Sequence, residues 1–331
     1  MRSIAVLLGL AWLAVPAAAQ THLIVITGLS GEPRYAAIFH EWATTLIDAA
    51  SGRWGVPESN VFYLAERVET DPSRISARST RENIENTLRD LAGRAGPDDK
   101  IFVLLIGHGS MRDGESRFNL PGPDMTPADF DALLAAFPTQ GIVFVNAASA
   151  SGEFIAQLSG ERRTIITATR SGSERNQTTF AAYFVEAFAG DGADVDKDER
   201  VSALEAFNYA RREVARVYES DGRLLTEHAL LDDNGDGEGS SEPGPQEADG
   251  RLARTLFLSG GTASVASGAL PSDPRLVALY EEKRRLEEQV AALRLRKDEL
   301  DPEVYERELE ELLVELALNT RSIRELEEKG Q

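Results

Sequence analysis

Apolar runs alternate with amphipathic segments along most of the chain. Five runs have an apolar centre: HLIVITGL from residue 22, NVFYLAE from residue 60, KIFVLLIGHGS from residue 100, GIVFVNA from residue 141 and RTIITATRS from residue 163. Runs without polar alternation are typical of strands buried on both faces. The segments between and after them have helical spacing, at 35–50, 80–95, 126–137, 178–190 and 203–220. This order predicts an α/β fold with a mostly parallel sheet flanked by helices.

Local signals support two of the helix starts, and one further run is a candidate for the last strand. Thr80 and Thr126 are residues of the type that caps a helix, and Pro127 fits a first helical position. The run RLARTLFL at 251–258 is predicted to close the sheet. The predicted α/β domain therefore spans residues 20–258.

The character of the chain changes from Ser259 onward. Residues 259–272 are rich in Gly, Ser and Ala, which is typical of a flexible linker. Within 273–331 a heptad pattern runs to Asp301-Pro302 and then starts again. Its core positions are Leu279, Lys283, Leu286, Val290, Leu293, Lys297 and Leu300, then Tyr305, Leu309, Leu312, Leu316, Asn319, Ile323 and Leu326. We expect an antiparallel helical hairpin (coiled coil) whose arms either pair only with each other or dock a second copy or a protein partner.

The amino-terminal segment has the features of a secretory signal peptide. Arg2 gives it a positive start, the run IAVLLGLAWLAV is too short to span a membrane comfortably, and AAAQ offers a cleavage site after Ala19. No other apolar stretch approaches membrane-spanning length. We expect residues 1–19 to be removed and the mature chain to be exported, to the periplasm or the extracellular space, without membrane insertion after cleavage.

Two features of the composition narrow the function classes. The sequence contains 0 cysteines, which excludes disulfides and zinc–thiolate sites. Its formal net charge of -20 argues against nucleic acid as a partner, because the phosphates would be repelled. The negative charge suits divalent cations instead, and part of it is concentrated in two loops.

The first acidic loop, Asp194 to Glu205, follows the twelve-residue calcium-loop pattern. Its ligands would be the side chains of Asp194, Asp196, Asp198, Ser202 and Glu205 and the backbone carbonyl of Arg200. Helical segments precede and follow it, as this motif requires. Glu199 departs from the pattern, because that position prefers glycine for a left-handed turn. We expect a structural calcium ion here, with a solvated acidic loop as the alternative.

The second acidic loop, DDNGDGEGS at 232–240, has half of the same pattern. Asp232, Asn234 and Asp236 occupy the first three ligand positions, and Gly237 stands where the turn needs it. Pro243 takes the place of the closing glutamate, and no helical segment follows. The pattern predicts a weaker structural calcium site, and an Asx-type turn explains it nearly as well.

Two motifs of small residues follow predicted strands. GHGS at 107–110 ends the third apolar run, and NAASASG at 146–152 follows the fourth. Ligands of parallel α/β sheets bind at the carboxyl ends of the strands. Because both motifs lie at such ends, we expect them to form one site.

These motifs resemble those of the legumain-like and caspase-like clan of cysteine peptidases, in which a His-Gly pair ends one strand and an Ala-Cys-x-Ser-Gly turn ends the next. His108-Gly109 matches the pair, and residues 148–152 match the turn, with Ser149 in the place of the cysteine. The resemblance extends to a Gly-x-x-Gly-x-x-x-Tyr loop at 28–35, a Thr-x-x-Asn helix start at Thr80 and the segment ITAT at 166–169.

The resemblance implies a caspase-like fold and a peptidase that hydrolyses peptide bonds. His108 would be the base, Ser149 the nucleophile, and the backbone N–H groups of Gly109 and Ser149 would hold the oxyanion. The peptide or protein substrate would contact Gly28, Tyr35, Ser151 and Thr169.

The chain departs from the family pattern in two places. A serine needs a base that is itself oriented by a third group, whereas a cysteine ionises readily beside a histidine. The legumains that cut after Asn have an arginine directly after the loop tyrosine, where this chain has Ala36. The alternatives to a peptidase are an inactive pseudo-peptidase, stabilised by calcium, that binds a peptide or protein, and a calcium-responsive scaffold.

Overall fold

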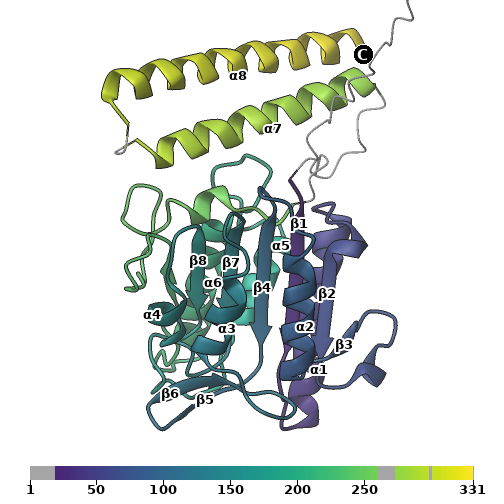
Figure 1. Cartoon of the computed structure of the whole chain (residues 1–331), viewed down its shortest axis with the longest axis vertical. Coiled ribbons are helices and arrows are strands. Elements are labelled where there is room, and N and C mark those ends of the chain that lie inside the picture. The colour runs from purple at the N-terminus through teal and green to yellow at the C-terminus, as the bar shows by residue number, and fades with distance from the viewer. Residues whose placement is uncertain (1–18, 260–272, 298–299, 331) are drawn as a thin grey trace, which may run out of the picture.

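The computed structural model describes residues 19–259, 273–297 and 300–330. The predicted signal peptide, residues 1–19, and the predicted linker, residues 259–272, lie almost entirely outside these ranges. The described chain forms an α/β domain and two long helices that lie across one end of it (Figure 1). Within the described ranges, no helix combines the length and the apolar character that crossing a bilayer requires.

The five apolar runs form parallel strands of one sheet, as predicted. They are β1 (Thr21–Thr27), β2 (Val61–Ala65), β4 (Lys100–Ile106), β7 (Gly141–Asn146) and β8 (Arg163–Thr167). Two short strands, β3 (Ala77–Arg78) and β9 (Leu230–Asp232), complete the order β3-β2-β1-β4-β7-β8-β9, in which β9 is antiparallel to its neighbour. The carboxyl ends of the parallel strands share one edge of the sheet, at the bottom of Figure 1.

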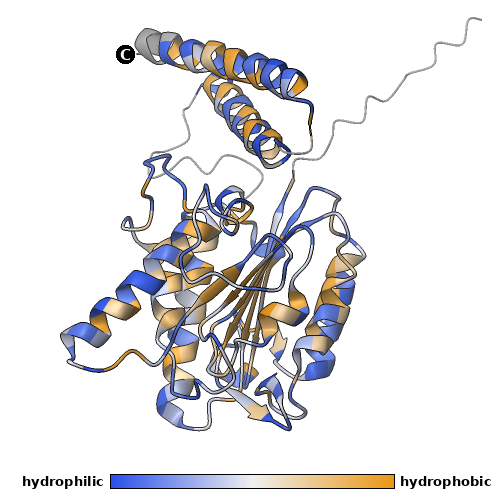
Figure 2. Ribbon diagram, turned by 90° about the vertical axis from the view of Figure 1, so that its left-hand side faces the viewer, coloured by the Kyte–Doolittle hydropathy of each residue, from blue (hydrophilic) through white to orange (hydrophobic). Residues whose placement is uncertain are grey.

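Helices cover both faces of the sheet because its strands are apolar on both faces. On one face lie α1 (Pro33–Gly52), α5 (Phe180–Ala189) and α6 (Ala203–Ser220), and on the other α2 (Arg81–Ala92), α3 (Pro127–Leu134) and α4 (Phe154–Leu158). Successive side chains of β4 divide between the two cores: Phe102 enters the first and Val103 the second. In Figure 2 the orange strands lie between the two helical layers.

The two predicted helix caps are present. Thr80 Oγ1 accepts a hydrogen bond from the Asn83 N–H, and α2 begins directly after it. Thr126 and Asp129 form a reciprocal capping box at the start of α3, whose first residue is Pro127. These caps fix where each helix begins after its loop.

The run at 251–258, predicted to close the sheet, is not one of its strands. Its centre is a 3-10 turn, Ala253–Thr255, and the Leu256 carbonyl accepts the Ala203 N–H at the start of α6 at 2.8 Å. The run looks like a strand because its apolar side chains, Leu256 and Leu258, are buried. The sheet is closed instead by β9, which has 3 residues and therefore shows no periodicity.

The two carboxyl-terminal helices form the predicted antiparallel hairpin. α7 (Pro274–Leu295) and α8 (Pro302–Gly330) run in opposite directions across the amino ends of the strands (Figure 1). The second arm starts at the predicted break. Five predicted core positions are buried: Leu286, Val290, Leu293, Asn319 and Ile323. Lys297, also predicted in the seam, is exposed. The arms thus pair with each other, and docking of a second copy or another protein stays a prediction.

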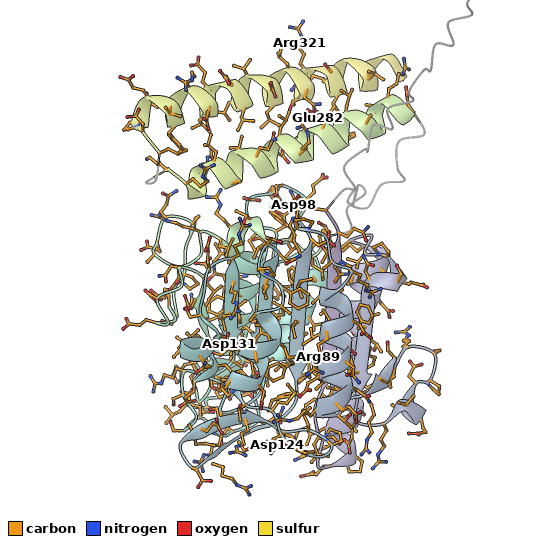
Figure 3. All side chains as sticks on the ribbon, viewed as in Figure 1. Arg89, Asp98, Asp124, Asp131, Glu282 and Arg321 are labelled. Atoms are coloured by element: carbon orange, nitrogen blue, oxygen red, sulfur yellow. The ribbon has the colours of Figure 1, made fainter. Side chains whose placement is uncertain are left out.

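The two ends of the domain carry different features. Asp98 lies at the end next to α7, on which Glu282 stands, and Asp124 lies at the opposite end (Figure 3). At that opposite end, β5 (Gly109–Arg112) and β6 (Glu115–Phe118) form a small antiparallel sheet that starts directly after His108. This small sheet was not predicted, because each strand has 4 residues.

Candidate active site

His108 follows the end of β4, and a backbone carbonyl and two aromatic rings hold its side chain. Its Nε2 lies 3.2 Å from the carbonyl oxygen of Ser30, in the loop after β1. The ring packs edge-on against Tyr35 and Phe39 of α1, with centroids 4.9 and 5.3 Å away. Because a carbonyl accepts hydrogen bonds and donates none, Nε2 carries the proton and Nδ1 is left as the acceptor. Ser30 therefore fixes the tautomer that a general base at Nδ1 needs.

The surroundings of His108 favour its neutral form. Burial of the ring lowers the pKa of His108 and outweighs the Ser30 hydrogen bond and the charge of Glu32, which both act to raise it. The imidazole is therefore neutral at neutral pH, as proton abstraction requires.

Ser149 lies at the neighbouring strand end, after β7, and is 3 % exposed. Its hydroxyl oxygen is 3.2 Å from the backbone nitrogen of Gly109 and 3.3 Å from the carbonyl oxygen of the same residue. Among the described residues, no hydrogen bond joins Ser149 to the His108 ring. The two motifs thus meet at Gly109. The Ser149 hydroxyl accepts a hydrogen bond from the Gly109 N–H, which is predicted to hold the oxyanion.

The contact between the two strand ends leaves no room for a side chain at Gly109. A Cβ atom there would lie 2.1 Å from the carbonyl oxygen of Ser149. The backbone N–H of Ser149 has no acceptor among the described residues. The edge therefore offers two backbone donors. The Gly109 N–H is bound to the Ser149 hydroxyl, and the Ser149 N–H has no partner in the described chain.

The turn after Ser149 is strained and firmly held. Ala150 has a φ of 53°, a left-handed conformation that non-glycine residues rarely adopt. Its N–H donates to the carbonyl of Glu174 at 2.7 Å, and its carbonyl accepts from the hydroxyl of Ser116 at 2.7 Å. Backbone strain of this kind is typical of turns that present a nucleophile.

Two of the residues predicted to contact substrate, Ser151 and Thr169, are turned into the protein. Each is 1 % exposed, and their hydroxyl oxygens are 3.0 Å apart. Thr169 Oγ1 also accepts the Ser151 N–H at 2.7 Å. These contacts tie the turn to the end of β8, so the structure gives both hydroxyls a role in the turn.

The other two predicted contacts, Gly28 and Tyr35, lie beside His108. Gly28 lines a cavity of about 450 Å³ together with Ser30, Ala36 and Phe39. Tyr35 is half-buried against the His108 ring, and the Arg34 guanidinium lies 4.5 Å from its centroid. The cavity adjoins the loop after β1, and neither His108 nor Ser149 is among its lining residues.

The sequence analysis did not identify Glu66, which also lines this cavity. Its Oε2 accepts the N–H and the hydroxyl of Ser30 at 3.0 and 2.6 Å. Burial acts to raise the pKa of Glu66, but the Ser30 hydrogen bonds and the charges of Arg67 and Arg78 together lower it. The charged carboxylate thus holds the loop that orients His108. Its place directly after the second apolar run was the signal available in the sequence.

The first acidic loop brings its three aspartates together. One ligand atom from each of Asp194, Asp196 and Asp198 lies within 4.8 Å of the others. The N–H groups of Asp198 and Glu199 donate to the Asp194 carboxylate at 3.2 and 3.1 Å. Glu199 has a φ of 66°, so a non-glycine residue takes the left-handed conformation of this position.

The other predicted ligand residues of the first loop have further contacts, within the loop and outside it. Glu205 accepts the Val195 N–H at 2.9 Å and caps α6 together with Ser202. The Arg200 guanidinium lies over the ring of Phe257 at 3.5 Å. Burial and then the charge of Asp196 raise the pKa of Asp198 to about 6. Residues of this loop and of the helical hairpin line a cavity of about 710 Å³, so the larger cavity lies at the opposite end of the sheet from His108.

The second acidic loop starts from a buried residue. Asp232, the last residue of β9, is 1 % exposed, whereas Asn234 and Asp236 are exposed. Asn234 Oδ1 accepts the Asp236 N–H at 2.8 Å, and Gly237 has a φ of 78°, the conformation expected of it.

Comparison with known proteins adds no family to these observations: no protein-family model and no curated protein matches the chain. The resemblance to legumains therefore rests on the motifs and on their placement.

Proposed function

We propose that this protein is an exported, legumain-type peptidase with a caspase-like fold, in which Ser149 attacks the peptide bond and His108 is the base. The observation that carries the proposal is the contact of His108 Nε2 with the Ser30 carbonyl. Its Nε2 proton is bound to the Ser30 carbonyl, so Nδ1 is the nitrogen that can take a proton. The lowered pKa of His108 keeps this base neutral at neutral pH.

In the proposed reaction, hydrogen bonds are first exchanged at Gly109. The substrate carbonyl oxygen replaces the Ser149 hydroxyl on the Gly109 N–H, and the Ser149 N–H is the second donor. The released hydroxyl turns to Nδ1 of His108, which takes its proton as the oxygen bonds to the carbonyl carbon. The imidazolium then protonates the leaving amine, and an ester to Ser149 remains. Water, deprotonated by the same imidazole, hydrolyses the ester and restores the serine.

The group that orients the base sets the expected rate. In serine triads a carboxylate holds the histidine and stabilises its charged form. Here the Ser30 carbonyl holds the ring but is uncharged, so it stabilises the imidazolium less. We therefore expect slow hydrolysis with serine and faster hydrolysis with cysteine, whose thiol ionises beside an imidazole.

Substitution of Ser149, combined with a fluorophosphonate probe, tests the proposal. The probe should label the wild-type protein at Ser149, and should label neither Ser149→Ala nor His108→Ala. On a mixed peptide substrate, Ser149→Cys should be faster than wild type by on the order of tenfold, and Ser149→Ala should be inactive. Equal rates for wild type, Ser149→Cys and Ser149→Ala would exclude Ser149 as the nucleophile.

One observation favours a second function, the binding of a peptide without hydrolysis. The Ser149 hydroxyl is buried and bonded to the backbone of Gly109 instead of to His108. A bound peptide that leaves these bonds intact would not be cut. Wild-type protein that binds peptide but is not labelled, together with an active Ser149→Cys variant, would assign this second function.

The calcium and export predictions complete the proposal. The convergence of Asp194, Asp196 and Asp198 supports a structural calcium ion in the first loop. The signal-peptide pattern supports export. A rise in melting temperature when calcium is added to chelator-treated protein is the expected result, and no shift at millimolar calcium would remove the ion from this proposal.

A further inference from the structure

We propose that the second acidic loop is a binding site for a divalent cation of the calcium type, closed by a carboxylate from outside the loop. The ligands would be the side chains of Asp232, Asn234, Asp236 and Asp249 and the backbone carbonyl of Glu238. The sequence pattern predicts only half a site, because Pro243 stands at the closing position. In the folded chain, Asp249 would supply this carboxylate, because its Oδ1 accepts the N–H of Asp233, the residue after Asp232.

The observation that points to a cation is an unpartnered carboxylate oxygen on Asp232. The residue is 1 % exposed, and its Oδ1 accepts the Gly235 N–H at 3.2 Å. Its Oδ2 is buried and has no hydrogen-bond partner. An ionised oxygen in that position is strongly unfavourable unless a positive group or a donor meets it. A bound cation satisfies this requirement.

The groups around Asp232 add negative charge and no ion-pair partner. Asp233 and Asp249 are 8 % and 4 % exposed. In the described part of the chain, no ion pair includes Asp232, Asp233, Asp236 or Asp249. A cation would offset the repulsion among these carboxylates.

The two buried neighbours of Asp232 have different roles. The carboxylate of Asp233 accepts the N–H of Gly250 at 2.8 Å through one oxygen and the N–H of Ala253 at 2.7 Å through the other. The carboxylate of Asp249 accepts the Asp233 N–H at 3.1 Å through Oδ1, and no hydrogen bond to Oδ2 is found in the described chain. Asp249 thus keeps one carboxylate oxygen that can bind a cation. Asp233 instead fixes the position of the segment that carries Asp249.

Binding would bring the second loop into a tighter arrangement than the one described. Three carboxylates of the first loop approach within 4.8 Å of one another, and no such group of the described residues lies in the second loop. The cation would therefore draw Asp249 and Asp236 toward Asp232. Because Asp232 ends β9 and pairs with Ile165 of β8, the ion would fasten the segment around Asp249 to the edge of the sheet.

Calcium titration of the full chain tests the assignment. The first loop is disabled by the double substitution D196N/D198N, so that any remaining calcium binding belongs to the second loop. Calorimetric titration of this chelator-treated protein should show a single calcium site. Asp249→Asn should weaken it by on the order of tenfold or more, because the closing charge is lost. Glu247→Gln, which removes the same charge from an exposed side chain outside the ligand set, should change Kd by less than about threefold.

The effect of Asp232→Asn on melting temperature should change sign between chelator and calcium, which a purely structural role of Asp232 would not produce. In chelator the variant should melt above wild type, because a buried charge without a partner has been removed. In millimolar calcium it should melt below wild type, because only wild type is also stabilised by an ion in the second loop. No calcium binding by the D196N/D198N protein, equal effects of Asp249→Asn and Glu247→Gln, or the same loss of melting temperature in both conditions would overturn the proposal. If Asp232→Asn does not fold, the Asp249→Asn and Glu247→Gln pair decides alone.

Discussion

The carboxyl edge of the sheet and the two acidic loops differ in the charge and the partners of their polar groups. At the edge, the His108 ring and the Ser149 hydroxyl are neutral, and both are bonded to backbone groups. In the loops, carboxylates converge, as at Asp194, or lie buried with an unpartnered oxygen, as at Asp232. The polar side chains at the edge thus find partners within the chain, whereas the loops leave negative charge that the proposed cations would offset. Changes at the edge should be independent of calcium, and changes in the loops should not.

The largest effect is expected from Gly109→Ala. The new Cβ atom would lie 2.1 Å from the carbonyl oxygen of Ser149, so the two strand ends must separate. Overpacking of this kind costs about 3 kcal/mol, and displacement of an oxyanion donor lowers kcat by roughly a hundredfold or more. Urea unfolding and peptide hydrolysis measure the two losses, which should be the same with and without calcium.

Gly52→Ala is the matched control for this substitution. A Cβ atom at Gly52 meets nothing within 4 Å, and the expected change in the free energy of unfolding is below about 0.5 kcal/mol. A Gly109→Ala variant as stable and as active as Gly52→Ala would show that the edge does not depend on this contact.

The pH dependence of stability separates the two regions, because their pKa shifts have opposite signs. Burial lowers the pKa of His108, so below about pH 6.5 the unfolded chain binds more protons at this residue and stability falls as the pH falls. Burial is the first cause that raises the pKa of Asp198 and of Asp249 to about 6. There the folded chain binds more protons between about pH 4 and 6, so stability is lost as the pH rises through 6.

Unfolding measured from pH 4 to 8, in chelator and in calcium, should resolve the two contributions. The ion replaces the proton on the aspartates, so calcium should remove the loss of stability near pH 6. The contribution of His108 should remain, and His108→Gln should remove it in both conditions. Identical profiles with and without calcium would break the distinction between the edge and the loops.

A smaller effect is expected from Ser151→Ala. The hydroxyl accepts the Thr169 N–H at 3.2 Å, and its loss leaves that buried N–H unpaired, at about 1 to 3 kcal/mol. The KM for peptides should not change, because the side chain is turned away from the cavity. Ser173→Ala, an exposed serine nearby, should change stability by less than about 0.5 kcal/mol. A raised KM with unchanged stability would instead place Ser151 in contact with substrate.

The sequence predicts the sheet well because a strand buried on both faces is a continuous apolar run. The order of β1, β2, β4, β7 and β8 and the break at Asp301-Pro302 follow from such runs and from proline. The short strands β5, β6 and β9 were missed, since 3 or 4 residues show no period. The run at 251–258 was wrongly predicted as a strand, because a buried segment has the same apolar residues whether or not it pairs with a sheet.

The candidate site is only partly visible in the sequence, because a pattern places residues on elements but does not aim their side chains. Strand ends locate His108 and Ser149. The inward orientation of Ser151, the link from Glu66 through Ser30 and the hydrogen bond of Asp249 to the Asp233 backbone depend on contacts between segments far apart in the chain. Reading the acidic loops by pattern alone therefore overlooks Asp249.

The smallest effect is expected at Glu199, where the two loops can be compared at the same position. The second loop has Gly237 there, at a φ of 78°, and the first loop has Glu199, at a φ of 66°. Relief of left-handed strain is worth about 1 to 2 kcal/mol, and the greater backbone entropy of glycine offsets roughly half of it. Glu199→Gly should therefore raise the free energy of unfolding by about 0.5 kcal/mol. Glu199→Gln removes the same charge and keeps the strain, so it should give no gain. If glycine also tightens calcium binding relative to glutamine, backbone geometry limits the first loop as a calcium site; if the two variants bind equally, Glu199 stores strain that has no connection with the ion.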